Sequence, residues 1–407
     1  MNKCRICNKT KLSLIIDYKK NAFAGSLLKK NEIKKESKYS LKLLFCNNCS
    51  HLQINNLINP KKLFSKYLWE TGISKSNLKL INDLIKDINK YINIDKINTF
   101  FEIASNDGSC LKIINKNFKS KVVGIDPAKN IVKQANKDGI FTINNFFSYR
   151  YSKYIKKKFK GFNVCLARNV IAHVHDPVDI FFGVKELLNK NGVFILEFPH
   201  LLNIYNDLQY DNVFHEHVGY HSLKSIIDIC NLTKMKVVAA KKINSQGGSL
   251  RVFVSHTNSK LKVSRNISKI LKEENDNKIY EYNSWKKFKN KVRQNKENLE
   301  KLFNKLAKKR KIISVYGASG KGQTLLQLIK NSDKIFNKVY DKSKLKQGLY
   351  TPGTHLLIDN PDNIYLDQPD YIFVCTWNII EEILSEHKRY HSKIGKFIIP
   401  FPIPKII

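Results

Sequence analysis

Short apolar runs alternate with amphipathic stretches from about residue 98 onward. Four such runs come first: Thr99–Ile103, Lys121–Ile125, Phe162–Leu166 and Val193–Glu197. This alternation is typical of βαβ units that build a parallel sheet. Two further strands are predicted after them, Met235–Ala240 and Leu250–Ser255, joined by a turn at 246–249.

The rest of the chain divides around this region. Residues 265–309 are highly charged and place apolar side chains at helical spacing, which predicts one or two connecting helices. A second βαβ pattern begins at Ile312–Tyr316 and includes a strand ending at Asp341 and another at Tyr371–Cys375. The first sixty residues are short, polar and turn-rich. We therefore expect an α/β protein with boundaries at 1–60, 61–260, 261–309 and 310–407.

Charge and composition narrow the possible functions. The chain of 407 residues has 72 Lys and Arg against 34 Asp and Glu, a formal net charge of +38. The excess is spread over the whole chain instead of forming one stripe, so we do not expect a nucleic-acid partner. No apolar run is long enough for a membrane span, and the N-terminus lacks the apolar core of a signal peptide. A cytoplasmic location is expected; the sequence gives no indication of the oligomeric state.

Two Cys-x-x-Cys pairs flank the N-terminal region. The sulfur ligands are Cys4, Cys7, Cys46 and Cys49. Two such pairs complete a four-sulfur shell around Zn²⁺, with no open position for catalysis, so the zinc is predicted to be structural. A redox dithiol or a group of buried thiols is the alternative.

A small-residue turn follows the strand that ends at Ile103. Its candidate ligand residues are Glu102, Ala104, Asn106, Asp107 and Gly108, with Ala104 and Asn106 standing where glycines are usual. The neighbouring strand ends in Asp126 and Pro127, and a carboxylate there can accept both hydroxyls of a ribose. Because the turn is acidic and lacks a phosphate-binding glycine trio, a cationic cofactor, S-adenosylmethionine (SAM), fits better than NAD. An ordinary strand–turn–helix junction with a capping Asn106 or Asp107 is the alternative.

Histidines gather after the next two strands. Six of the eleven lie close together in sequence: His173, His175, His200, His215, His217 and His221. Asn169 and His173 follow a strand end, where ligands bind in open α/β sheets. His215-Glu216-His217 is too tight for a helical zinc motif and is better interpreted as an acid–base cluster. Buried structural histidines are the alternative.

In this order and spacing the motifs resemble the zinc-containing, three-domain, SAM-dependent C-methyltransferases that act on nucleotide-linked keto-deoxysugars. The resemblance implies a zinc-binding module (1–60), a class I SAM-methyltransferase Rossmann-like domain (61–260), connecting helices (261–309) and a C-terminal Rossmann-like substrate-binding domain (310–407). It implies that His217 is a general base next to a 4-keto group, with Glu216 and His173 nearby. Phe214 departs from the family, which commonly has Tyr there, and Tyr210 or Tyr220 is a possible substitute. O-methylation of a sugar-type acceptor, or a zinc-containing nucleic-acid-binding protein, is the alternative function.

The resemblance implies that the substrate lies between the central and the C-terminal domain, in contact with both. The turn at 317–322 lies at a predicted helix N-terminus, which favours an anion, and Lys321 and Lys346 are available for a diphosphate. The turn also fits a glycine turn that only packs helix against strand. The expected substrate-binding residues are Tyr67, His215, Tyr220, Gly248, Ser249, Arg251, Ser319, Lys321, Asp341 and Lys346.

Overall fold

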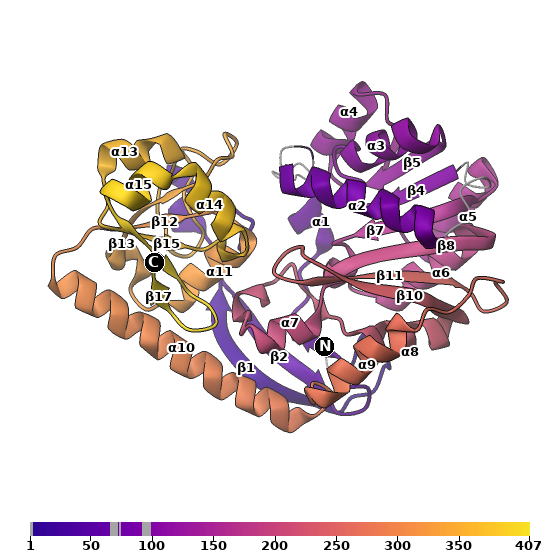
Figure 1. Ribbon diagram of the computed structural model, residues 1–407, viewed down its shortest axis with the longest axis horizontal. Coiled ribbons are helices and arrows are strands. Elements are labelled where there is room, and N and C mark those ends of the chain that lie inside the picture. Colours follow the sequence, from indigo (N-terminus) through magenta and orange to yellow (C-terminus); the bar gives the residue numbers. More distant parts are fainter. Residues whose placement is uncertain (1–2, 66–71, 73–74, 92–98) are drawn as a thin grey trace.

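The computed structural model describes residues 3–65, 72, 75–91 and 99–407, and the described chain forms three β-sheets. Figure 1 shows the two larger sheets in separate bodies, with β1 and β2 running between them along the lower side. Tyr67 lies outside the described residues. Among the helices that the structure describes, none is long and apolar enough to cross a membrane.

The seven-stranded sheet carries the first predicted βαβ pattern. In spatial order its strands are β10 (Met235–Ile243), β11 (Ser249–His256), β8 (Leu188–Pro199), β7 (Phe162–Arg168), β4 (Thr99–Ile103), β5 (Lys121–Asp126) and β6 (Thr142–Asn144). Strands β8, β7, β4, β5 and β6 are parallel, and β11 is antiparallel to both neighbours. The six runs predicted as strands in this region are all strands of this sheet.

Helices cover both faces of this sheet because its strands are apolar on both sides. Phe100 packs with one helical layer and Phe101 with the other, as the two-residue period of a strand requires. The helices are α2 (Lys75–Tyr91), α3 (Ser109–Phe118), α4 (Lys129–Lys137), α5 (Tyr149–Phe159), α6 (Pro177–Leu187) and α8 (Leu223–Thr233).

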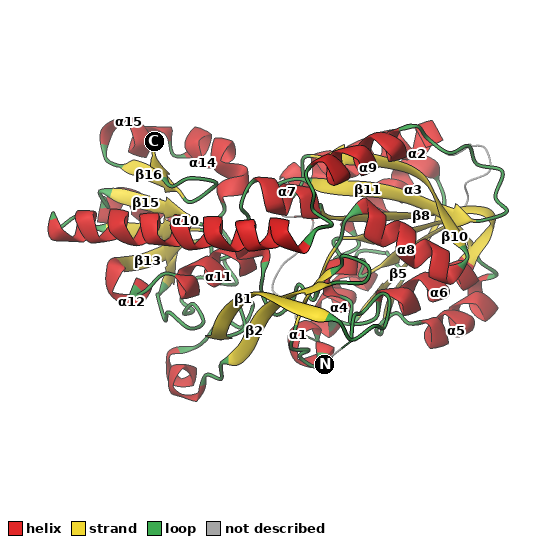
Figure 2. Ribbon diagram, turned by 90° about the horizontal axis from the view of Figure 1, so that it is seen from below, coloured by secondary structure: helices red, strands yellow, loops and turns green. Residues whose placement is uncertain are grey.

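The six-stranded sheet forms the C-terminal body. In spatial order its strands are β14 (Ile358–Asp359), β13 (Phe336–Tyr340), β12 (Ile313–Tyr316), β15 (Tyr371–Val374), β16 (Lys396–Ile399) and β17 (Lys405–Ile406), with β17 alone antiparallel. Its helices are α11 (Gly320–Leu328), α12 (Ser332–Ile335), α13 (Ile364–Asp367), α14 (Ile380–Glu386) and α15 (Lys388–Lys393). The long helix α10 (Tyr282–Lys308) runs beneath this body, as Figure 2 shows. Helix α9 (Asn266–Asp276) precedes it, so both lie in the segment predicted to connect the two bodies.

The N-terminal sheet is antiparallel and was not predicted. It consists of β1 (Leu12–Asn21), β2 (Tyr39–Cys46), β3 (Leu52–Ile54) and β9 (Gly219–Tyr220). The apolar alternation of β1 is weak, because most of its side chains are only partly buried. Its last strand, β9, comes from a distant part of the chain, directly after the His215-Glu216-His217 motif. The remaining short helical segments are η1 (Lys30–Lys35), α1 (Pro60–Phe64), η4 (Ile171–His173), α7 (Leu201–Asn206), η5 (Tyr210–Asn212), η6 (Pro361–Asn363) and η7 (Trp377–Ile379).

Candidate active site and zinc centre

The four predicted sulfur ligands meet in one place. The Sγ atoms of Cys4, Cys7, Cys46 and Cys49 all lie within 4.8 Å of one another. The Cys4–Cys49 and Cys7–Cys46 sulfur pairs are 3.5 and 3.6 Å apart. Zn–S bonds of about 2.3 Å in a tetrahedron place sulfurs roughly 3.8 Å apart, so the four thiols fit a structural zinc ion.

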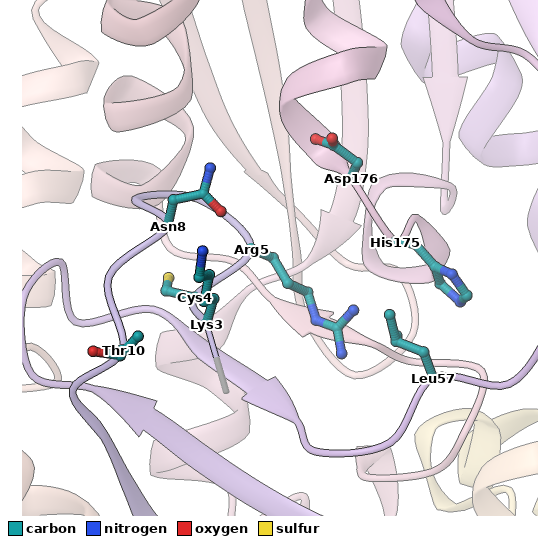
Figure 3. A pocket seen from close by; sticks show the side chains of 8 residues that line it. All are labelled: Lys3, Cys4, Arg5, Asn8, Thr10, Leu57, His175 and Asp176. Atoms are coloured by element: carbon teal, nitrogen blue, oxygen red, sulfur yellow. The ribbon is translucent and has the colours of Figure 1, made fainter. Parts of the chain in front are cut away.

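A cavity of about 620 Å³ opens beside this cluster, between the zinc-binding module and the start of α6 (Figure 3). Arg5 reaches into it from between two zinc ligands and is 8% exposed. Its Nη2 donates to the carbonyl of Ile54 at 2.9 Å. Burial lowers the pKa of the Arg5 guanidinium to about 10. The guanidinium therefore joins the zinc site to strand β3.

The turn after β4 has the backbone shape of a glycine-rich turn without most of its glycines. Ala104, Asn106 and Gly108 have φ values of 51°, 53° and 74°, all in the left-handed region. At Gly108 a Cβ would lie 3.0 Å from Ile140, so a side chain there would have to displace its neighbour. The carboxylate of Asp126 accepts from the N–H of Asn106 at 3.0 Å and from the N–H of Ala128 at 2.8 Å. Asp126 thus holds the turn closed from the neighbouring strand.

Several buried polar atoms around this turn have no hydrogen-bond partner. They are Oε2 of Glu102, Oγ of Ser105 and Oδ1 of Asn169. Buried polar groups are normally satisfied, so unpartnered atoms at the carboxyl ends of β4 and β7 indicate a ligand site. Burial raises the pKa of Glu102 to about 8, although Arg168 lies 3.9 Å from its carboxylate. A small-residue turn with free buried acceptors, beside the carboxylates of Asp107 and Asp126, fits the cationic cofactor SAM.

Two other residues predicted for the cofactor have local roles. Asp107 accepts from the N–H of Gly72 at 2.8 Å and from the N–H of Ser109 at 3.1 Å, so it ties Gly72 to the turn. The carbonyl of Pro127 accepts from Asn144 on β6 at 3.1 Å. Both stand at the edge of the turn that Asp126 closes.

The histidine cluster consists of His173, the last residue of η4, and His215 and His217, which follow η5. His217 donates Nδ1–H to the carbonyl of Asn212, 3.1 Å away, because a carbonyl can only accept. Its ring lies 4.7 Å from that of His173 and 4.2 Å from that of Phe214. Burial lowers the pKa of His217 well below 6.5, and the nearby His173 and Lys321 add to this. His217 is therefore neutral at pH 7, with a lone pair on Nε2.

Glu216 and His215 point toward the N-terminal module instead. The carboxylate of Glu216 hydrogen-bonds the backbone of Gly25, and burial raises its pKa to about 7. The His215 ring packs against Phe23 and Tyr39, at centroid distances of 5.3 and 6.3 Å. The ring of His173, which is partly buried, hydrogen-bonds the backbone of Glu216, and desolvation lowers its pKa to about 4.

Neither tyrosine offered as a substitute at position 214 supplies a hydroxyl to the base. Tyr220 donates its O–H to the backbone carbonyl of His217 at 3.0 Å. Tyr210 donates its O–H to Asn295 on α10 at 2.9 Å. Phe214 instead covers the His217 ring and lies against Gly320 of the C-terminal body. Tyr220 supports the backbone of the base, and its hydroxyl is not directed at the ring.

Lys321 joins the two bodies at this point. It is 7% exposed, and its Nζ donates to the carbonyl of Gln246 in the β10–β11 turn at 2.7 Å. Burial lowers the pKa of Lys321, and the nearby Asp211 opposes this shift. Trp377 adds a second contact, from its indole N–H to Asp211 at 2.8 Å. The structure thus brings Lys321 near His217, across the boundary between the bodies.

The β10–β11 turn and the C-terminal turn are held by their own contacts. Ser249 donates its hydroxyl to the carbonyl of Ser245 at 2.9 Å, and Gly248 has a φ of 104°. Ser319 caps α11 by accepting from the N–H of Gly322 at 3.1 Å. Lys346 pairs with Asp341 at 3.1 Å. These contacts leave Lys321 as the cation of the C-terminal turn that faces the histidine cluster.

Arg251 does not fit the substrate-binding role expected for it. Its side chain is fully buried, and its guanidinium pairs with Glu197 on β8 and Asp87 on α2. A third donor reaches the carbonyl of Leu80 at 3.2 Å. Glu197 also pairs with Arg168, so the arginine belongs to a row of alternating charges inside the seven-stranded sheet.

Sequence reasoning missed residues whose role depends on their partners. Asn212 fixes the tautomer of His217 through its backbone, which no side-chain pattern could reveal. Asp211 and Gln53 are fully buried polar residues, and Trp377 bonds to the former. A weak signal existed for Asp211, which stands in the polar stretch before the His215-Glu216-His217 motif.

Three family models match the chain in succession. A zinc-binding domain matches residues 4–64, a methyltransferase domain residues 77–239, and a C-methyltransferase C-terminal domain residues 244–402. The fold, the acidic turn and the matched domains define a SAM-dependent methyltransferase with a structural zinc-binding module. The three matched domains follow one another in the order expected for the zinc-containing, three-domain C-methyltransferases.

One curated relative matches over the full chain. C-methyltransferase NovU of Streptomyces niveus is 26% identical over 408 residues, which cover 100% of this chain and 97% of the relative.

Two solved structures align with less than half of this chain. The PH0226 protein of Pyrococcus horikoshii OT3 is 15% identical with a TM-score of 0.36, covering 49% of this chain and 99% of that one. Magnesium protoporphyrin IX methyltransferase of Synechocystis PCC 6803, solved with bound SAM, is 11% identical with a TM-score of 0.32, covering 44% and 76%. The class of protein stated above does not rest on these low scores.

Proposed function

We propose that this protein methylates a carbon next to the keto group of a nucleotide-linked 4-keto-deoxysugar. The matched C-methyltransferase C-terminal domain and the similarity to a C-methyltransferase support methyl transfer to carbon. His217 lies near Lys321 of the C-terminal body, so residues of both Rossmann-like bodies are available to a substrate with a sugar end and a nucleotide end. The sugar and its nucleotide are part of the proposal.

The hydrogen bond between His217 Nδ1 and the carbonyl of Asn212 is the observation that carries this proposal. Because Nδ1–H is donated to Asn212, Nε2 holds the lone pair and is the only ring atom able to take a proton. The lowered pKa keeps the ring neutral at physiological pH. A general base must be deprotonated before it acts, so the ring is ready to remove a proton from the carbon beside the ketone.

The developing negative charge on the substrate needs a partner as well. SAM supplies the electrophilic methyl group when bound. Lys321 is buried, cationic and near His217, so it is placed to stabilise an oxyanion or to meet the diphosphate. Glu216, held by the backbone of Gly25, and His173 support the backbone around the base.

The test is His217→Asn, assayed with a panel of nucleotide-linked 4-keto-6-deoxyhexoses in D₂O. The wild type should exchange the proton beside the ketone and transfer methyl to that carbon. The variant should lose both at least about 100-fold, the usual contribution of a general base, while calorimetry shows unchanged SAM binding.

His256→Asn is the matched control, because His256 lies at the far end of β11 and is half-buried. It should behave as the wild type. Methyl transfer to oxygen without carbon-bound exchange, or loss of SAM binding in the His217 variant, would contradict the assignment.

A further inference from the structure

The zinc site and the candidate base belong to one continuous hydrogen-bonded path. The path starts between the first two zinc ligands and ends at the strand that follows His217. It passes through β3, the short central strand of the N-terminal sheet, whose three residues are all buried. Because β3 is hydrogen-bonded both to the zinc loop and to β9, a shift of the zinc loop would also move β9.

Gln53, in the middle of β3, makes the first connection. It is 0% exposed, and its amide is satisfied at both ends by the backbone of the zinc loop. Its Oε1 accepts from the N–H of Arg5 at 2.9 Å, and its Nε2 donates to the carbonyl of Lys3 at 3.1 Å. The Arg5 guanidinium adds a bond to the carbonyl of Ile54 at 2.9 Å. Both contacts bridge the zinc loop and β3.

Strand β3 then carries the connection to β9. Gln53 pairs with Gly219 and Leu52 with Tyr220 in antiparallel register. The N–H of Ile54 donates to the carbonyl of Val218 at 3.2 Å. These residues follow His217 directly, and the Tyr220 hydroxyl returns to the carbonyl of His217. The carbonyl of Val218 is therefore held by β3, and the carbonyl of His217 is held by Tyr220 of the strand that pairs with β3.

The other side of this segment is held by the methyltransferase body. The N–H of Val218 donates to the carbonyl of Ala172 at 2.7 Å, beside His173. Val218, which follows the base, is thus hydrogen-bonded both to β3 of the N-terminal sheet and to the methyltransferase body. Its position therefore depends on both.

We propose that Gln53 is a positioning residue for methyl transfer: through its two bonds to the zinc loop it fixes β3, and β3 fixes the backbone of His217. The zinc-binding module then contributes to the active site without any metal contact to the substrate. This role rests on the function proposed above for His217. A misplacement of about 1 Å in a reacting group can cost about 100-fold in rate, so a modest shift of β9 is enough.

The test compares Gln53→Met, which keeps the size and removes both bonds, with Asn55→Leu. Asn55 lies two positions further along and bonds only to β2, through Lys42 and Ser40, so it is the matched control. Arg5→Met and Arg5→Lys form a second pair, in which lysine can restore one bond to Ile54. Zinc content, SAM binding, amide hydrogen exchange at residues 217–220 and kcat and KM are measured on each full-length protein.

We expect Gln53→Met to keep its zinc and its SAM affinity within twofold. Amide exchange at 217–220 should rise at least about tenfold and kcat should fall about tenfold, with KM little changed. Arg5→Met should do the same, and Arg5→Lys should recover part of the loss. Exchange and kcat equal to those of Asn55→Leu would overturn the proposal. If the wild type turns over no keto-sugar, the proposed function fails, and the amide exchange alone decides whether Gln53 holds β9.

Discussion

The two larger sheets each contain the same hydrogen bond between an aspartate and the turn after a parallel strand. Only in the seven-stranded sheet do free polar atoms remain beside that turn for a ligand. In each, an aspartate at the end of the second strand accepts from the turn after the first strand: Asp126 from Asn106 at 3.0 Å, and Asp341 from Ala318 at 2.8 Å. Each also accepts from the N–H two residues further on. The backbone design of the two turns is therefore shared.

The difference lies in what surrounds each carboxylate. Asp341 pairs with Lys346, whose ammonium also donates to the carbonyl of Ala318, so the chain supplies its own cation. No Lys or Arg forms an ion pair with Asp126 among the residues that the structure describes, and unpartnered atoms of Glu102 and Asn169 lie nearby. A turn that both sheets share can bind a ligand only where the hydrogen-bond acceptors around it have no partner within the protein.

The largest expected effect is a difference in SAM affinity between variants of Asp126 and Asp341. Asp126→Ala should weaken SAM binding about 100-fold, because a buried carboxylate that accepts ligand hydroxyls contributes about 2–3 kcal/mol. Asp341→Ala should leave SAM affinity within twofold of the wild type. Calorimetric titration of both folded proteins with SAM and with its demethylated product makes the comparison. Equal losses in the two variants would mean that the open and the closed turn are not functionally different.

The sequence could predict the parts of this comparison that depend on local pattern. The strand Thr99–Ile103 has the predicted bounds, because its five residues form an isolated apolar run. The four zinc ligands meet as their spacing predicts, because a Cys-x-x-Cys turn fixes its two sulfurs locally. The acidic turn and Asp126 also lie together, since the ends of adjacent parallel strands meet at one edge.

Other features depend on contacts between distant segments and could not be predicted. Arg251 is typical of a surface charge beside a turn, but its partners come from β8 and α2. The pairing of β3 with β9 joins residues far apart in the chain, and neither strand is long enough to give a pattern. Lys346 was expected to meet a diphosphate because nothing in the sequence reveals that Asp341 already neutralises it.

The next effect concerns the backbone of the two turns. Ala104 has a φ of 51° and Gly317 a φ of 97°, so both occupy the left-handed region. Ala104→Gly should stabilise the protein by about 1 kcal/mol, because alanine is strained there and glycine is not. Gly317→Ala should destabilise it by about 2 kcal/mol, since the new Cβ would also meet Thr376. Urea unfolding measures both; a loss of stability in Ala104→Gly would contradict the strain at that position.

The smallest effect concerns the charge state of the open turn. Burial raises the pKa of Glu102 to about 8, from an ordinary value of 4.5. Between these values the folded protein holds a proton that the unfolded chain has released, so the free energy of unfolding falls as pH rises from 4.5 to 8. The nearby Arg168 favours the charged carboxylate, but burial outweighs it and the pKa of Glu102 stays raised, so stability is lost across this window. Glu102→Gln cannot release the proton, so its stability should fall less steeply when both proteins are unfolded with urea at pH 5 and pH 8. A parallel pH dependence would show that Glu102 is already ionised in the folded protein, and that its free oxygen is a charged acceptor for the cationic cofactor even at acid pH.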